Sequence, residues 1–559
     1  MKTTKYIFMT VLLCVLCMYN FSCSDSYLDE KPYSLYAPET LTDEKGVEAS
    51  LKGLHRIYGE LWTWSDQQGW LSCWQLGTDV ASPGGIQGIE VPFYNYAALV
   101  DDNAGVKYMW QKCYQVINNA NAVIAAVGES GDPAKIAEAR FFRGYMYNHL
   151  VTLYGAVPLL LDPTSSAKTD YTRTPVAEVD AAIVADLQYA SDNLPDINHL
   201  VAEGRANKYM AMQALGEVYL RIGNPGEAEK VLNTIINDGQ FSLIKARYGT
   251  HTALPGDYYH DMFIYGNQHR SQGNAEAIWT FELEYNKNVA GGFTNAPQHR
   301  RVYKPAYHNV PGMRPGLADS LGGRGNGRMR PSNWVKYELY KEGDIRNSEY
   351  NIKRHFYYNN NNLTWPMTVG VDKDGWRVAV DAPDAVGVKT VKLGDPVVVA
   401  KGDTIEYIFP HTTKWNSWDV DDEFGWDCVK DFPIMRLGET YLLRAEARFK
   451  NNNSAGAAAD INVLRERAFP EYPAKGKVEA SEITLNFILD ERARELYAEE
   501  NRRMTLVRAG TLVERAALNT EETVRGKIAG LTKNNLLLPI PYDERMRNKD
   551  AVLEQNPGY

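Results

Sequence analysis

Cysteine is scarce in this 559-residue chain, and the spacing of the few that occur excludes a disulfide scaffold and a cysteine metal site. The chain has six cysteines, of which Cys14 and Cys17 lie in an N-terminal apolar segment. Cys73, Cys113 and Cys428 are far apart and form no C-x-x-C pair, the spacing that zinc and redox sites use. We therefore expect at most one disulfide and favour three unpaired, buried thiols.

Signatures of catalysis and of nucleic-acid binding are also missing. The sequence contains no H-E-x-x-H zinc motif and no G-x-S-x-G nucleophile motif. The formal net charge is −10, whereas binding to nucleic-acid phosphates requires a surplus of Lys and Arg. We expect no nucleic-acid partner, no cofactor and no catalytic residue.

Only one long apolar run occurs, and it lies at the N-terminus. Lys2 and Lys5 precede the uncharged apolar segment 6–18. About 20 apolar residues are needed to span a bilayer, so this shorter run is typical of a signal-peptide core. We predict that residues 1–22 form a removable signal and that no membrane-spanning helix follows.

The end of this leader is marked by Cys23, which follows the small residue Ser22. The arrangement resembles a bacterial lipoprotein signal, in which the cysteine becomes the acylated first residue, although Asn20 stands where that motif usually has Leu. Acyl chains on Cys23 would hold the mature chain to a membrane without a spanning helix. The alternative is an ordinary secreted protein with an unmodified cysteine.

Helical periodicity dominates the first third of the mature chain. Apolar residues recur at steps of three and four between residues 136 and 153, which predicts one face of a helix. Asp132 is placed to cap this helix, Pro133 suits its first turn, and Gly155 is expected to end it.

Paired helices are predicted in two places. The segment 205–239 contains two apolar stripes joined by a turn, with Asn224 as the cap and Pro225 as the first residue of the second helix. It resembles a tetratricopeptide unit, whose helices bury their faces by stacking on neighbouring pairs. A second pair is predicted over 439–468, and a long last helix is expected from near Ser481.

The middle of the chain, residues 246–435, is rich in Gly, Asn, Pro, Tyr and Trp and is predicted to be mainly loops. Strand-like runs occur at 276–283 and 396–400. The mature chain is then organised as a helical part, 23–245, the loop-rich insert, and a second helical part, 436–559, which we expect to form one compact unit. In such an arrangement helical repeats supply the scaffold and loops carry binding.

Five segments in a fixed order carry a resemblance to a known family. They are YLDEKP just after Cys23, EARFFRGYMYNHLVTLYGAVPLL (138–160), DFPIMRLGETYLLRAEA (431–447), ILDERARELYAEENRRMTLVRAGTL (488–512) and LLLPIPYDERMRNKDAVLEQNPGY (536–559). Together they resemble the SusD/RagB family of outer-membrane nutrient-binding lipoproteins over nearly the whole mature chain. The resemblance implies a mostly α-helical fold in which four tetratricopeptide-like helix pairs support an irregular, loop-rich ligand face with short strands.

The resemblance also implies a location, a ligand and a partner. Such lipoproteins lie at the outer face of the outer membrane, anchored here through Cys23, and Asp25, Asp29 and Glu30 resemble the acidic tags that direct export to the surface. They bind oligosaccharides and deliver them to a SusC-like TonB-dependent transporter without catalysis. Two alternatives remain: a peptide- or protein-binding lipoprotein of the same fold, and a surface glycoside hydrolase.

Aromatic residues in predicted loops are the candidate ligand contacts, because a sugar ring needs a flat apolar face with hydrogen-bonding groups beside it. The candidates are Trp70, Trp74, Asp79, Tyr94, Asn95, Tyr96, Tyr303 and Trp334. The first six lie between predicted helices and the last two lie in the middle region. The alternative for each is that it packs its loop against the helices.

Acidic residues of the middle region have a functional and a structural interpretation. Asp419, Asp421 and Asp422 offer the oxygen ligands that Ca²⁺ prefers, but they lack the spacing of an EF-hand, so a solvated acidic loop is favoured. Asp344 and Arg346 resemble a recurrent pair of the family and are expected to form a structural ion pair.

Two further charged segments are interpreted structurally. The arginines of the loop 322–330 are favoured as solvated groups over contacts to acidic sugars. Glu491, Glu495 and Glu499 lie among arginines on one predicted helix. A glycosidase pair must face a substrate across a cleft, so an ion-pair network is the favoured interpretation.

Overall fold

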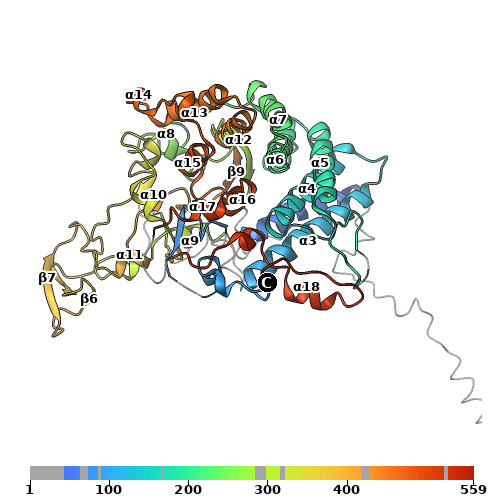
Figure 1. Ribbon diagram of the computed structural model, residues 1–559. Helices are drawn as coiled ribbons and strands as arrows, with labels where there is room; N and C mark the ends of the chain where they lie inside the picture. The colour runs from blue at the N-terminus through green and yellow to red at the C-terminus, as the bar shows by residue number, and fades with distance from the viewer. Residues whose placement is uncertain are drawn as a thin grey trace, which may run out of the picture. The chain divides into compact units, whose positions relative to one another are not determined.

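Helices make up most of the regular structure in the part of the chain that the computed structural model describes (Figure 1). The described residues are 43–62, 74–85, 88, 90–164, 166, 168–283, 297–314, 322–417, 428–520 and 527–559. Contacts divide the chain into residues 1–50 and residues 51–559. The helix α2 (Glu44–Gly59) crosses this division, and the other elements of the described residues belong to the second part.

A continuous array of helices forms the scaffold of the second part. It consists of α3 (Ala104–Val127), α4 (Pro133–Tyr154), α5 (Val176–Asn193), α6 (Lys208–Arg221), α7 (Pro225–Asn237), α12 (Leu437–Lys450) and α13 (Ser454–Ala468). Each helix packs against the next, and α7 packs directly against α12 although the whole middle region lies between them in the sequence. The expected mostly α-helical fold is therefore confirmed, with both predicted helix pairs in place. None of the described helices is long and apolar enough to cross a bilayer.

Local capping places the ends of these helices as predicted. The Asp132 side chain accepts a hydrogen bond from the Ala134 N–H at 2.9 Å, Pro133 opens α4, and Gly155 ends it with a φ of 75°. Asn224 caps α7 in the same way, and Pro225 is the first residue of that helix. A left-handed φ favours glycine, which explains why the helix stops where it does.

The last long helix is shorter than predicted. α15 spans Leu485–Leu496, beginning after the cap Thr484, and the next helix, α16, covers Arg502–Arg508. Between them Ala498 has a φ of 66°, and its carbonyl accepts a hydrogen bond from the Trp415 indole N–H at 2.9 Å. A side chain distant in sequence therefore binds the backbone just beyond Leu496, where α15 ends.

Short two-stranded sheets tie distant segments together. β2 (Ala277–Phe281), predicted from the sequence, pairs antiparallel with β9 (Phe432–Arg436). β1 (Ala81–Pro83) pairs with β3 (Met329–Pro331), and β4 (Ile352–Lys353) pairs with β8 (His411–Thr412). Each pair closes a long loop, so these sheets shape the middle region.

A three-stranded sheet, which the sequence did not predict, lies within the middle region. Its strand order is β6 (Arg377–Val378), β5 (Met367–Asp372), β7 (Ala385–Val391). The strand predicted at 396–400 does not form, apart from a single bridge at Pro396. Side chains explain this, because the Val398 N–H donates to the Tyr358 hydroxyl, and other backbone groups of this run are bonded similarly.

A buried asparagine joins the helical array to β2. Asn207 caps α6 by accepting hydrogen bonds from the Tyr209 and Met210 N–H groups at 3.0 and 3.2 Å. Its side-chain amide donates to the Ile278 carbonyl at 2.9 Å, and the residue is 1% exposed. One side chain therefore serves both a helix end and a strand edge.

We expect Asn207→Ala to destabilise the protein more than Asp132→Ala. Loss of an exposed cap costs about 1 kcal/mol. Removing Asn207 also leaves the buried Ile278 carbonyl unpaired, which adds about 1–3 kcal/mol. Urea midpoints of the two variants, measured side by side, would check this; equal midpoints would contradict the dual role of Asn207.

Candidate functional site

An aromatic-walled pocket lies where α4, α6, β9 and α16 meet. Its walls include Tyr58, Trp74, Tyr145, His149, His299, Trp415 and Phe432, and its polar lining includes Gln213, Glu217, Glu439, Arg492, Glu499, Glu500 and Asn501. Its volume is about 70 Å³, which is room for a few water molecules. The pocket combines flat apolar surfaces with hydrogen-bonding groups, the two features that recognise a sugar ring.

Stacked rings form one wall of this pocket. The rings of Trp415 and His299 are stacked, with centroids 3.8 Å apart and planes inclined by 19°. Phe432 packs against both, at 5.3 Å from Trp415 and 5.1 Å from His299. Burial, together with the charge of Lys430, holds the pKa of His299 well below its usual value. His299 is therefore a neutral, flat ring at physiological pH.

A second group of lining rings comes from α4 and from Trp74. The Tyr145 ring packs on the His149 ring at 4.7 Å, and Trp74 lies 6.1 Å from His149. His149 bonds the Tyr145 carbonyl through Nδ1 at 2.9 Å. Burial lowers the pKa of His149, so this histidine is also neutral. A spacing of four residues on one helix brings Tyr145 and His149 together.

Carboxylates at the base of the pocket are held by cations. Arg492 Nη2 lies 2.8 Å from both Glu439 Oε1 and Glu500 Oε2. Burial acts to raise the pKa of Glu500, but Arg492 and Arg502 lower it overall. Burial raises the pKa of Glu439, which Arg492 offsets only in part. Because Arg492 lies between these two carboxylates, they act as hydrogen-bond acceptors in an ion-pair cluster.

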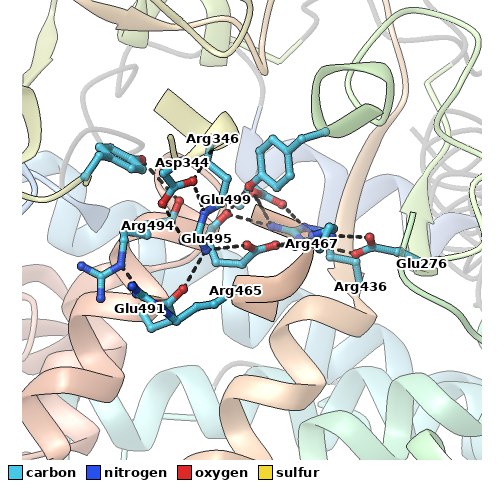
Figure 2. Close-up of polar contacts among 12 residues, drawn as sticks. Glu276, Asp344, Arg346, Arg436, Arg465, Arg467, Glu491, Arg494, Glu495 and Glu499 are labelled. Atoms are coloured by element: carbon cyan, nitrogen blue, oxygen red, sulfur yellow. Dashed lines mark hydrogen bonds and ion pairs between the residues drawn. The ribbon is translucent and has the colours of Figure 1, made fainter. Parts of the chain in front are cut away.

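Behind the pocket, a buried ion network surrounds α15 (Figure 2). Arg346 Nη1 bonds Glu491 at 2.9 Å and Glu495 at 3.0 Å, and Asp344 binds the same guanidinium at 2.7 Å. All four side chains are fully buried. The predicted Asp344–Arg346 ion pair is confirmed, and so is the interpretation of the α15 glutamates as a structural network.

The network extends from α15 into both strands of the β2–β9 sheet. Arg467, on α13, binds both Glu495 and Glu276, the residue before β2. Arg436, at the end of β9, binds Glu495 at 2.5 Å and Glu499 at 2.7 Å. Figure 2 shows these side chains converging on Glu495. Glu499 also lines the pocket, so the network fixes the pocket's base.

The predicted ligand residues that the structure describes are mostly buried. Trp74 lines the pocket, but Tyr94, Tyr96, Tyr303 and Trp334 expose no more than 7% of their surface. In the described structure these four rings pack within the fold, and their role as ligand contacts stays a prediction. Asn95 is exposed. Trp70 lies outside the described residues and stays a prediction.

Arginines near the C-terminus explain the burial of several of these residues. Asp79 is fully buried, with Arg502 at 2.6 Å and Arg515 Nε at 2.9 Å. The Tyr96 hydroxyl accepts from Arg503 at 2.6 Å. The Arg515 guanidinium lies 5.1 Å from the centre of the Trp334 ring. The loops therefore dock on the C-terminal helices through buried cations, which the sequence pattern did not reveal.

Two arginines of the loop 322–330 are buried, although the sequence predicted solvated groups. Arg328 is buried and pairs with the fully buried Glu90 at 2.9 Å. Arg330 Nε donates to the Pro83 carbonyl at 2.9 Å. The β1–β3 pairing brings these partners together across more than 200 residues of sequence. These two arginines are structural, and no acidic sugar is needed to explain them.

Some of the residues for which a metal site or a free thiol was predicted lie outside the described part of the chain. Among the described residues, no group of three or more His, Cys, Asp or Glu side chains is arranged to hold a metal ion. Asp419, Asp421 and Asp422 lie outside those residues, as do Cys23 and Cys73. Cys113 and Cys428 are free and buried, as predicted.

Glu495→Gln should unfold the protein more easily, because Arg346, Arg436 and Arg467 would lose a shared counter-charge in the interior. Breaking a buried ion pair from one side costs about 3–5 kcal/mol. Glu342→Gln is the matched control, since Glu342 pairs with Lys475 at the surface, at 3.3 Å, and should leave the urea midpoint unchanged. Similar midpoints for both variants would contradict the network's structural role.

The free energy of unfolding should decrease in acid, because two further buried carboxylates, Glu446 and Glu138, become protonated. Arg508 and Lys450 lower the pKa of Glu446 to about 2 against the effect of burial, and Arg205 and His55 do the same for Glu138. Each folded pKa lies below the unfolded value, so this stabilisation is complete above about pH 4.5 and is lost as pH falls toward 2. Melting temperatures between pH 7 and pH 3 would check this, with Glu446→Gln showing a shallower decline; an unchanged slope would contradict it.

Comparisons with known proteins agree with this fold. Residues 275–559 match the profile described as the SusD family, and residues 26–220 match one described as starch-binding associating with outer membrane. A SusD-like protein, P25 of Formosa agariphila, is 27% identical over 96% of this chain and 97% of its own length.

Solved structures show the same fold. A laminarin-binding SusD-like protein covers 92% of this chain and all of its own length, with a TM-score of 0.63 and 21% identity. Surface glycan-binding protein A from Bacteroides fluxus gives a TM-score of 0.67 at 19% identity, over 92% of this chain and all of its own. Because the first profile spans half of the chain and includes β2, β9 and the α15 network, the chain belongs to the SusD family.

Proposed function

We propose that the protein is a surface lipoprotein of the outer membrane that binds oligosaccharides or polysaccharide fragments and passes them to a SusC-like TonB-dependent transporter. Acylated Cys23 is the anchor in this proposal. Family membership supports it, together with the description of the second matching profile, which names starch binding and the outer membrane. The protein acts by binding and release, without catalysis.

The observation that carries the proposal is the wall of neutral, stacked rings above a polar base. Trp415, His299 and Phe432 line the pocket although each is no more than 5% exposed, and Glu499, Glu500 and Asn501 add polar groups to the same lining. At about 70 Å³ the pocket is too small to enclose a sugar ring. We therefore place the ligand at its mouth, with one ring edge entering between the walls. Two of the fold relatives are named as a laminarin-binding and a glycan-binding protein, which supports a glycan ligand.

We expect Trp74→Ala to weaken glycan binding about twofold, the change that follows when roughly 20 Å² of apolar surface is no longer covered. Native gels containing laminarin or soluble starch would measure it through retardation of the protein. Trp110→Ala is the matched control, because Trp110 is equally buried but packs on Tyr154, away from the pocket lining. Its retardation should equal that of the parent.

The same assay separates the alternatives. Release of reducing ends from laminarin or starch would favour a hydrolase. Binding to a peptide library with no retardation by any glycan would favour the peptide-binding alternative. Equal retardation of parent and Trp74→Ala would show that the ligand lies elsewhere. Trp70→Ala, tested alongside, examines the remaining predicted aromatic contact.

A further inference from the structure

One tryptophan lies open on the surface, apart from the pocket. Among the tryptophans whose side chains the structure describes, Trp376 is 44% exposed and Trp365 is partly buried in a core cluster, whereas Trp74, Trp110, Trp279, Trp334 and Trp415 are buried. Trp376 immediately precedes β6, in the turn that joins β5 to β6. In Figure 1 the strands β6 and β7 lie well away from α4, α6 and α16, which line the pocket. This ring is therefore separate from the site described above.

The turn that carries Trp376 is held rigidly. The Asp372 side chain accepts from the Asp374 and Trp376 N–H groups at 2.9 and 2.8 Å, and the Asp372 N–H donates to the Trp376 carbonyl at 2.8 Å. Gly375 adopts a φ of 84° at the tightest point, and its carbonyl accepts from the Lys401 N–H at 2.7 Å. A residue whose backbone is held before and after it by hydrogen bonds loses little conformational entropy when it binds a ligand.

The ring itself rests on the neighbouring chain. A Cβ built on Gly402 would lie 2.6 Å from the Trp376 ring, so the glycine is what lets the indole lie against the backbone there. Lys401 Nζ lies 5.8 Å from the ring centre, within the range of a cation–π contact. With one part of the ring supported in this way, the residue still keeps 44% of its surface exposed.

Hydrogen-bonding groups lie close to Trp376 along the chain and in the neighbouring segment. Lys373 and Asp374 are both exposed and lie in the same turn, and Lys401 adds a donor from the neighbouring segment. The core of this sheet is built from its other residues, with Val369 and Val391 buried in a cluster that does not include Trp376. Trp376 is therefore not part of the core of this sheet, and the part of its ring that Gly402 and Lys401 leave open is accessible to a ligand.

We propose that Trp376 is a second carbohydrate-binding platform, which stacks on one sugar ring of a polysaccharide while Lys373, Asp374 and Lys401 bond its hydroxyl groups. The proposal rests on the proposed function, because it assumes that the protein handles glycans. Two separated contacts on one polymer raise the overall affinity through effective concentration. The platform therefore favours long chains over short oligosaccharides, which reach only one site.

The test compares polymer and oligosaccharide binding by Trp376→Ala in the full-length protein. In native gels with laminarin or soluble starch, we expect retention to weaken about tenfold relative to the parent. Calorimetric titration with six-residue oligosaccharides of the same glycan should give unchanged affinity at the pocket. Trp376→Phe, which keeps a flat ring, should retain polymer binding within about twofold.

Tyr337→Ala is the matched control, because Tyr337 is 72% exposed on α10 (Asn333–Tyr337) and is not proposed to bind. Melting temperatures establish that the variants fold. If Trp376→Ala melts earlier than the parent, Trp376→Leu replaces it, since leucine still packs on Gly402 but has no flat ring.

Each outcome decides a different claim. Retention of Trp376→Ala, or of its leucine replacement, equal to the parent overturns the platform and leaves the proposed function intact. A parent that neither polymer retards overturns both. Weaker binding of polymer and oligosaccharide alike would show that Trp376 acts through the pocket, which also overturns a separate platform.

Discussion

Burial of charge around α15 is the constraint on which the rest of the molecule depends. Glu491 and Glu495 are fully buried, and each contacts several guanidinium groups drawn from other parts of the chain. Burial acts to raise the pKa of Glu495, but Arg467, Arg436 and Arg346 hold it well below its usual value. Isolated charges of this kind would be too costly to bury. The network therefore forms only when β2, β9, α13 and the middle region are all in place. Its formation thus depends on the tertiary fold as a whole.

Local signals explain what could be predicted from the sequence. The ends of α4 and α7 follow from Asp132, Gly155 and Asn224, whose partners lie within four residues along the chain. Long-range contacts explain what could not. α15 ends early because Trp415, more than 80 residues away, bonds the Ala498 carbonyl. Propensity and periodicity contain no information about such a partner.

The site shows the same division between local and distant causes. The sequence identified Trp74 as a lining residue, but it missed Trp415 and His299, whose stacking depends on how distant segments of the middle region pack. The sequence also predicted loop aromatics as ligand contacts, and two of them, Tyr96 and Trp334, are buried against arginines near the C-terminus. Exposure is a property of the folded chain, and a loop composition alone does not determine it.

Direct packing of α7 against α12 has an evolutionary consequence. The chain leaves the helical array after α7, and residues 238–436 form the excursion. It re-enters the array at α12, which packs directly on α7. The entropy of closing so long an excursion grows only with the logarithm of its length. Segments of the insert outside the α15 network can therefore lengthen, shorten or be exchanged at small thermodynamic expense while the scaffold persists. One scaffold of this type can thus carry inserts of different length and composition.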